Sequence, residues 1–278
     1  MDILNALIMG IVQGLAEYLP VSSSGHLEIC RELLGLDLSG AESLQFDVML
    51  HVATVLSTIV ILWREFSGLC RSFFTLRRDD NTSLVCKILV SCIPVGIVGV
   101  FFKKQIEAFF GTDLVIVGAC LCLTALLLTF SYVARRRLEA RGTASGAKYT
   151  PRDITYFDAF TIGIAQAVAV LPGLSRSGST IATGLALGVK RDQVANFSFL
   201  MVIIPILGQA LLDIKDYITD PAATATAAIG IVPMIVGFLA SFIVGCIACK
   251  WMINLVKRGN LLWFALYCLV IGIICIAH

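Results

Sequence analysis

Two segments of the chain carry residue types that could act together on a phosphate group. In the first, Gln13 and Glu17 are four residues apart, a spacing that places both on one face of a helix. The run SSSGH, Ser22–His26, follows directly. In the second, the run SRSG, Ser175–Gly178, contains Arg176 at its second position. The two segments together supply a carboxylate, an imidazole, a guanidinium and several hydroxyls.

These groups favour phosphoryl chemistry on a phosphate that is embedded at a membrane. Backbone N–H groups at a Gly/Ser-rich break before a helix bind anions, and the helix dipole helps them. The guanidinium of Arg176 offers a fixed fork of donors that suits phosphate oxygens. Glu17 and Gln13 could hold a hard divalent cation such as Mg²⁺ or Ca²⁺. One serine is a candidate nucleophile, with His26 as acid or base.

Each of these residues also has a purely structural interpretation. The serines could serve only as helix N-caps, and Arg176 could simply neutralise Glu17. His26 could be a residue of the cap region that bonds to backbone. Asp47 and His51, four residues apart, are either a pair at the membrane interface or part of the same site.

The composition indicates where such a site must lie. The 278 residues are 58% hydrophobic and 14% charged, whereas soluble domains have about 45–50% apolar and about 25% charged residues. This excludes a soluble enzyme, a disordered chain and a nucleic-acid-binding protein, and predicts a polytopic all-α membrane protein. The ten cysteines lie mostly in apolar runs, so we expect them to pack as small apolar residues.

Six stretches are long and apolar enough to span a bilayer, and two apolar regions are interrupted. The two interrupted regions, 3–36 and 155–188, contain the candidate residues at their Pro/Gly/Ser breaks. Non-helical backbone at membrane depth must be shielded by protein or a water-filled cavity, so we predict two re-entrant helical hairpins. The predicted spans are about 44–63, 84–102, 113–134, 194–212, 227–249 and 260–277.

The distribution of basic residues predicts the orientation. With both hairpins returning to the side from which they enter, 16 of the 21 Lys and Arg residues, including those of loops 64–83 and 135–153, lie on one side. The other side has four, namely Arg31, Lys103, Lys104 and Lys215, and Arg176 lies within a break. The basic side should be cytoplasmic and both termini outside.

The two interrupted regions resemble each other at an offset of 153 residues. Eight identities, including Gln13 with Gln166 and Gly25 with Gly178, fall within about twenty positions. Three predicted spans follow each copy, so the second copy enters the membrane from the opposite side. This predicts an inverted-topology repeat in a single membrane domain, 1–278. The first repeat covers about 1–134, a polar cytoplasmic connector covers 135–153, and the second repeat covers about 154–278.

The signature segments resemble a known family. QGLAEYLPVSSSGHL (Gln13–Leu27) and LPGLSRSGSTIATGLALG (Leu171–Gly188) are similar to the two signatures of bacterial undecaprenyl-diphosphatases, the bacitracin-resistance family. The resemblance implies hydrolysis of undecaprenyl diphosphate to undecaprenyl phosphate and inorganic phosphate, which recycles the lipid carrier for cell-wall synthesis. It also implies a bacterial plasma-membrane location, a divalent-cation requirement and a site open to the outer face.

The resemblance assigns roles to individual residues. The acidic motif falls on Gln13 and Glu17, which are the metal candidates, and Gln at the first position removes one charge from that pair. The implied catalytic residues are Glu17, Ser23, His26 and Arg176. A transporter of a prenyl phosphate or small anion, built on the inverted repeat, is the alternative function, and a homodimer is left open. The predicted phosphate-binding residues are Ser22, Ser24, Gly25, Ser175, Ser177, Gly178 and Thr180.

Overall fold

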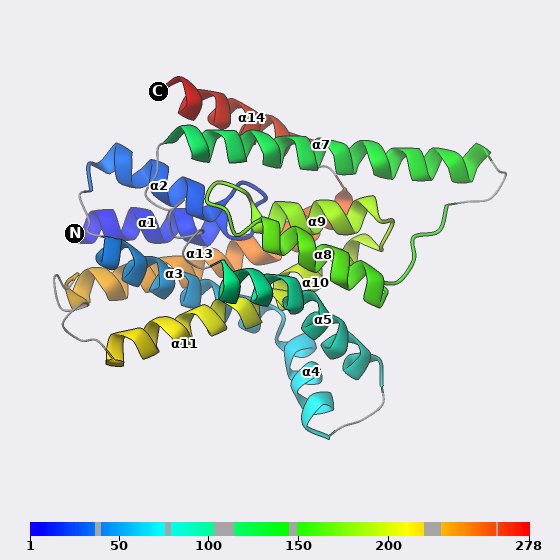
Figure 1. Ribbon diagram of the computed structural model, residues 1–278, viewed down its shortest axis with the longest axis horizontal. Helices are drawn as coiled ribbons and strands as arrows, with labels where there is room; N and C mark the ends of the chain where they lie inside the picture. Colours follow the sequence, from blue (N-terminus) through cyan, green and yellow to red (C-terminus); the bar gives the residue numbers. More distant parts are fainter. Residues whose placement is uncertain (37–39, 76–78, 103–113, 145–148, 220–228, 260) are drawn as a thin grey trace.

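The computed structural model describes residues 1–36, 40–75, 79–102, 114–144, 149–219, 229–259 and 261–278. Helices account for almost all of these residues (Figure 1), and the β-structure within them is a single bridge between Arg152 and Val189. The helices are α1 (Ile3–Ala16), α2 (Ser23–Leu34), α3 (Gly40–Ile61), α4 (Trp63–Thr75), α5 (Asp80–Phe101), α7 (Leu114–Ala144), α8 (Tyr156–Val168), α9 (Arg176–Ala186), α10 (Arg191–Met201), α11 (Ile203–Thr219), α13 (Ile231–Arg258) and α14 (Leu262–Ala277).

Several of these helices have the length and composition of membrane spans. Within the described residues four stretches qualify outright: Asp80–Phe101, Leu114–Arg141, Arg191–Leu212 and Ile231–Arg258. A fifth candidate is the pair formed by α3 and α4, which qualify only together and are bent by 88° at the break between Ile61 and Trp63. The helices α1 and α14 are apolar but shorter. The prediction of an all-α, multi-pass membrane protein is therefore confirmed.

Both predicted breaks are present. The first lies between Ala16, where α1 ends, and Ser23, where α2 begins, and the second lies between Val168 and Arg176. The two second helices start in the same way: Ser22 Oγ accepts from Gly25 N at 3.3 Å, and Ser175 Oγ accepts from Gly178 N at 3.0 Å. Ser22 and Ser175 are therefore N-caps, so the capping interpretation holds for these two serines.

The two breaks pack against each other in a reciprocal manner. A Cβ atom added to Gly25 would lie 3.1 Å from Gly173 Cα, and one added to Gly178 would lie 3.2 Å from Pro20 Cβ. These four residues form two pairs at the 153-residue offset, because Gly25 corresponds to Gly178 and Pro20 corresponds to Gly173. The buried aromatic and aliphatic side chains of Tyr18, Ile162, Ile181, Phe197 and Met201 belong to one core cluster beside the breaks.

Glycines allow the flanking helices to approach closely. A Cβ atom on Gly10 of α1 would lie 2.4 Å from the Gly237 carbonyl of α13, and one on Gly163 of α8 would lie 2.3 Å from the Ser91 carbonyl of α5. Gly10 and Gly163 are again 153 residues apart. Gly118 of α7 and Gly272 of α14 each face the other's carbonyl oxygen in the same way. Small residues at such crossings are typical of packed membrane helices.

Two predicted loops are partly helical. Residues 63–75 form α4, and α7 continues to Ala144, well into the predicted connector 135–153. The helix α4 does not form a long apolar stretch, because its apolar residues Phe66, Leu69 and Phe73 occupy only one face of the helix. For this reason the sequence does not predict it. Residues 145–148 of the connector lie outside the described residues, as do Lys103 and Lys104.

Candidate active site

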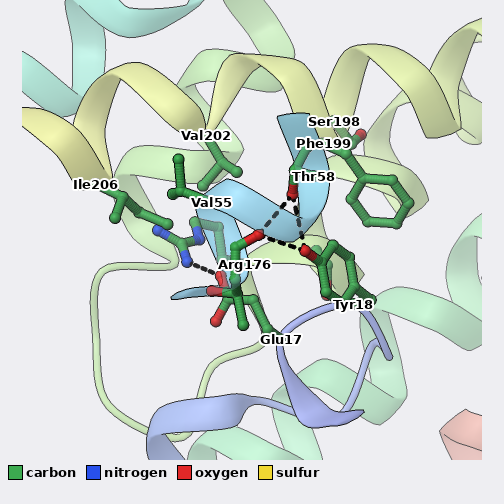
Figure 2. Close-up of a pocket in the computed structure, with 11 residues that line it drawn as sticks. Glu17, Tyr18, Val55, Thr58, Arg176, Ser198, Phe199, Val202 and Ile206 are labelled. Atoms are coloured by element: carbon green, nitrogen blue, oxygen red, sulfur yellow. Dashed lines mark hydrogen bonds and ion pairs between the residues drawn. The ribbon is translucent and has the colours of Figure 1, made fainter. Parts of the chain in front are cut away.

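The carboxylate of Glu17 is the centre of a polar cluster at the two breaks. Glu17 directly follows α1 and is buried. Its Oε2 atom accepts hydrogen bonds from Ser23 Oγ at 2.7 Å and from Gln13 Nε2 at 3.0 Å. Its Oε1 atom accepts from the guanidinium of Arg176, and Figure 2 shows the two side chains facing each other. The structure thus brings together Gln13, Glu17 and Ser23, which lie at or beside the first break, and Arg176, which follows the second break.

The ends of helices position this cluster. Ser23 is the first residue of α2, and Arg176 is the first residue of α9. Because the two breaks pack on each other, these two N-terminal residues meet at the same carboxylate. The ion pair between Arg176 and Glu17, which the structural interpretation predicts, is therefore present. Because Ser23 bonds to the same carboxylate, the pair also places the Arg176 guanidinium near the Ser23 hydroxyl.

His51 joins the cluster from α3. Its Nδ1 atom lies 2.7 Å from the backbone carbonyl of Asp47, and its Nε2 atom lies 3.5 Å from Glu17 Oε2. Asp47 is engaged elsewhere, because its carboxylate pairs with Arg31. The spacing of Asp47 and His51 was thus a useful signal, but only the histidine lies near Glu17.

His26 lies near the cluster with its ring nitrogens engaged elsewhere. Its Nδ1 atom lies 2.9 Å from the Ser22 carbonyl, and its Nε2 atom lies 2.7 Å from the hydroxyl of Tyr267. The ring also stacks on Tyr267, with centroids 5.6 Å apart. Among the described residues His26 has no side-chain hydrogen bond to Ser23. Sequence reasoning missed Tyr267, which lies in the apolar run of α14 without a motif around it.

The hydroxyls of the candidate phosphate-binding residues differ in the hydrogen bonds that they already make to the protein. Ser24 Oγ lies 3.3 Å from Ser22 Oγ and accepts from Gly173 N at 3.5 Å. Ser177 Oγ donates to the Leu19 carbonyl at 3.0 Å. Thr180 is buried and its hydroxyl donates to the Arg176 carbonyl at 3.0 Å within α9. Thr180 therefore supports the helix that presents Arg176.

The backbone at Ser22 is strained. Its φ of +71° is the one positive value at a non-glycine residue among the described residues. Such a conformation costs on the order of 1–3 kcal/mol, and residues of this kind cluster at functional sites. Here the strained residue turns the chain between Glu17 and Ser23, so it determines how the hydroxyl reaches the carboxylate.

A small cavity adjoins the Glu17–Arg176 pair (Figure 2). Apolar residues of the α10–α11 region, Phe199, Val202 and Ile206, line it together with Tyr18. Its volume of about 10 Å³ corresponds to roughly one water molecule. The Tyr18 hydroxyl donates to the Thr54 carbonyl at 2.6 Å and lies 2.9 Å from Thr58 Oγ1. These bonds fix the residue next to Glu17.

The oxygen atoms of Gln13 and Glu17 fit a hard divalent cation. Gln13 Oε1 is buried and has no hydrogen-bond partner. It lies on the side chain that already contacts Glu17, so a carboxylate and an unsatisfied carbonyl oxygen are adjacent. Within the described residues no three His, Cys, Asp or Glu side chains gather around a potential metal position. A cation here would therefore need phosphate oxygens and water as further ligands, which suits Mg²⁺ or Ca²⁺.

Comparison with known proteins identifies the family. The family model described as "Bacitracin resistance protein BacA" matches residues 6–274. The chain is 53% identical over 276 residues to the undecaprenyl-diphosphatase of Bacteroides fragilis, covering 99% of this chain and 98% of that relative. It is 52% identical over 275 residues to that of Parabacteroides distasonis and 42% identical over 273 residues to that of Christiangramia forsetii, covering 98% of this chain and 97% of the relative in both cases. The chain belongs to the BacA bacitracin-resistance family.

Proposed function

We propose that the protein is an integral membrane phosphatase that hydrolyses undecaprenyl diphosphate to undecaprenyl phosphate and inorganic phosphate. The observation that carries the proposal is the joint position of Ser23 Oγ and the Arg176 guanidinium on the Glu17 carboxylate. A hydroxyl that donates to a carboxylate beside a fixed cation is an arrangement that supports phosphoryl transfer, because the carboxylate can take the proton and the cation can bind phosphate oxygens. The relatives in Bacteroides and Parabacteroides carry the name of this activity.

In the proposed reaction Ser23 is the nucleophile. Its Oγ atom forms a bond to the terminal phosphorus while the bond from that phosphorus to the bridging oxygen breaks, and undecaprenyl phosphate leaves. Glu17 accepts the hydroxyl proton at Oε2, to which Ser23 already donates at 2.7 Å. Water then hydrolyses the phosphoserine and releases inorganic phosphate. In the second version Ser23 positions a water that attacks the phosphorus directly.

Arg176 and the N-termini of α2 and α9 bind the diphosphate. The guanidinium can exchange its bond to Glu17 for bonds to phosphate oxygens, which frees the carboxylate to act as a base. Other N–H groups of the first turns of α2 and α9 add donors around Ser22, Ser24, Ser175 and Ser177. The N–H groups of Gly25 and Gly178 already donate to the capping serines, so these two glycines contribute by letting the breaks approach each other.

His26 is proposed to move the proton to the leaving group. His26 follows Ser23 by three residues on α2, so both are on one face of the helix. Tyr267 holds the ring by a hydrogen bond and by stacking. His51 Nε2 lies 3.5 Å from Glu17 Oε2, so the imidazole is close enough to help orient the carboxylate.

A divalent cation is proposed to bind at Glu17 and Gln13. When bound, it supplies positive charge against the negative charge of the diphosphate. Rotation of the Gln13 amide exchanges its nitrogen and oxygen, so the unpartnered oxygen can turn toward the cation while Glu17 provides the carboxylate.

We further propose that the chain forms two inverted repeats with six crossings and two re-entrant helix pairs, α1–α2 and α8–α9. The reciprocal packing of the breaks supports this topology, as does the division of basic residues. Both termini then lie outside the cell, and the substrate reaches the site from the outer face.

Transport of a prenyl phosphate or small anion is the second candidate, and the reciprocal contacts between the two repeats favour it. Phosphate release from a prenyl diphosphate in detergent separates the two, because transport has no meaning without a membrane. We expect release that depends on an added divalent cation. Absence of release with every cation tested would favour the carrier.

Substitution of the nucleophile tests the mechanism. Ser23→Ala should lower kcat by at least about 100-fold, since it removes the attacking or positioning hydroxyl. Ser83→Ala, on the first turn of α5, is the control and should retain activity. Full activity of Ser23→Ala would overturn both versions. Rapid-quench labelling with terminally labelled substrate then distinguishes them, because only the covalent version yields phosphoserine.

A further inference from the structure

A second, larger pocket lies beside the C-terminal half of α7, whereas the N-terminal half of α7 contacts the second break. It has a volume of about 380 Å³ and is lined at the ends of α7, α9 and α13 and the beginnings of α10 and α14. Thr124 of α7 contacts Ser175 at the break, and Arg136 follows twelve residues later. The α7 residues of the pocket run from Ser131 to Glu139, so at 1.5 Å per residue they lie roughly 10–22 Å along the helix from the contact between Thr124 and the break.

The pocket is strongly basic. Four arginines and one glutamate line it: Arg135, Arg136, Arg191, Arg258 and Glu139. Glu139 receives Arg135 Nε at 3.2 Å and lies 3.6 Å from Arg191. Neither Arg136 nor Arg258 forms an ion pair with any other described residue. The lining charges therefore leave a net excess of positive charge, which an anion would offset.

Two of the arginines are held in place by the protein. Arg135 is buried, donates to the Val189 carbonyl at 3.0 Å and lies 4.9 Å from the centroid of the Tyr149 ring. The guanidinium of Arg191 occupies the space that a side chain at Gly259 would fill. Gly259, with φ of +79°, ends α13 in a conformation that favours glycine. The site is thus preorganised. Arg136, whose guanidinium carbon lies 5.1 Å from the centroid of the Tyr132 ring, and Arg258 are exposed and can close on a ligand.

The surroundings of the pocket match the headgroup level of a bilayer. Leu185, Leu261 and Leu262 form an apolar part of its lining. Trp263 follows directly and is 71% exposed, and Trp251 on the penultimate turns of α13 is 50% exposed. Exposed tryptophans of membrane helices concentrate at the interface with water. A basic pocket between helices at this level suits an anionic lipid headgroup.

We propose that this pocket binds a phosphate group, and that the phosphate belongs to an anionic phospholipid in the leaflet that faces the basic side of the protein. Arg136 and Arg258 bind the phosphate oxygens, Arg135 and Arg191 supply fixed positive charge, and the partly exposed Leu262 contacts the start of the acyl chains. Free inorganic phosphate has the same recognising chemistry and is the other source. The site is separate from the Glu17 cluster and does not rest on the proposed function.

Native mass spectrometry of the full chain in detergent tests the proposal. The probes are phosphatidylglycerol, phosphatidylcholine and inorganic phosphate. We expect retention of phosphatidylglycerol in preference to phosphatidylcholine, and at least fivefold weaker retention in the Arg136→Gln, Arg258→Gln double variant. The matched control is the Arg137→Gln, Lys257→Gln double variant, which removes the same charge from exposed neighbours that do not line the pocket.

The outcomes separate the two sources and the failure of the proposal. Competition of millimolar inorganic phosphate with phosphatidylglycerol, lost in the Arg136 and Arg258 variant, assigns the pocket to phosphate from either source. Lack of such competition with retained lipid preference assigns it to the lipid. Equal losses in both double variants, or equal retention of the two lipids by the native chain, would overturn the proposal. The melting temperature of each variant, compared with that of the native chain, checks that it is folded.

Discussion

At the scale of single residues, one carboxylate organises the site. Glu17 is contacted by a hydroxyl, an amide, a guanidinium and an imidazole, which come from both breaks and from α3. Residue types and spacing predict Gln13, Glu17 and Arg176, because these lie at breaks that the sequence marks with Ser, Gly and Pro, whereas the choice of Ser23 among the serines comes from the family resemblance. The proximity of His51 to Glu17 depends on how α3 packs, which local spacing does not determine.

Replacement of Arg176 by Lys tests the value of the guanidinium fork. The charge remains, but an ammonium cannot bind two phosphate oxygens in one plane. Hydrogen bonds to charged groups are worth about 1.5–3 kcal/mol, so kcat/KM for a prenyl diphosphate should fall by about 10- to 100-fold. Arg137→Lys on the exposed face of α7 should have no effect. Equal activity of Arg176→Lys and the native chain would show that only the charge matters.

Tyr267→Phe tests whether His26 is held for proton transfer. The substitution removes the hydroxyl that lies 2.7 Å from His26 Nε2 but keeps a ring for stacking. We expect a three- to tenfold lower kcat with little change in KM, and an altered pH–rate profile. Substrates with a more acidic leaving group should be affected less, since they need less protonation. An unchanged profile would exclude this positioning role.

At the scale of elements, short broken helices provide the chemistry and long helices hold them. The breaks are predictable because Pro, Gly and Ser interrupt apolar sequence at two places. The helix α4 is not found by that reasoning, since an amphipathic helix does not meet the criterion for a span. The continuation of α7 from residue 135 to Ala144 is not found either, because charged residues after an apolar stretch look the same in a helix and in a loop.

The crossing of α8 and α5 offers a test of how tightly these elements pack. Gly163→Ala would place a methyl group 2.3 Å from the Ser91 carbonyl. We expect lower thermal stability and lower activity, because α8 must move away from α5 and take the second break with it. Gly96→Ala on α5 is the matched control, since a Cβ atom there has nothing within 4 Å. Equal melting temperatures for the two variants would contradict close packing at Gly163.

At the scale of the whole molecule, the distribution of the basic residues predicts the orientation. The composition alone predicts a membrane protein, and the family follows from the two signature segments together with the similarity along nearly the full chain. The number of crossings is harder to predict, because α1 and α14 are shorter than typical spans. The offset of 153 residues indicates that each half is built in the same way.

Labelling of single cysteines with a membrane-impermeant thiol reagent tests the orientation. In a variant that lacks the ten native cysteines, Asp2→Cys at the N-terminus should react in intact cells because the termini are expected outside. Arg141→Cys near the end of α7 should react only after permeabilisation. Asp2 and Arg141 are both exposed. The reverse pattern would place the basic side outside and overturn the predicted topology.

The contact between Gly118 and Gly272 bears on how the two halves of the chain arose. The two glycines are 154 residues apart, nearly the repeat offset, and each meets the other's carbonyl oxygen. Such a self-reciprocal contact is what a homodimer has on its two-fold axis. A half-length ancestor that paired in opposite orientations would contain it, and tandem duplication would preserve it in one chain. Once joined, the halves could diverge: Ser23 and Arg176 occupy equivalent positions, and one now carries a hydroxyl where the other carries a cation.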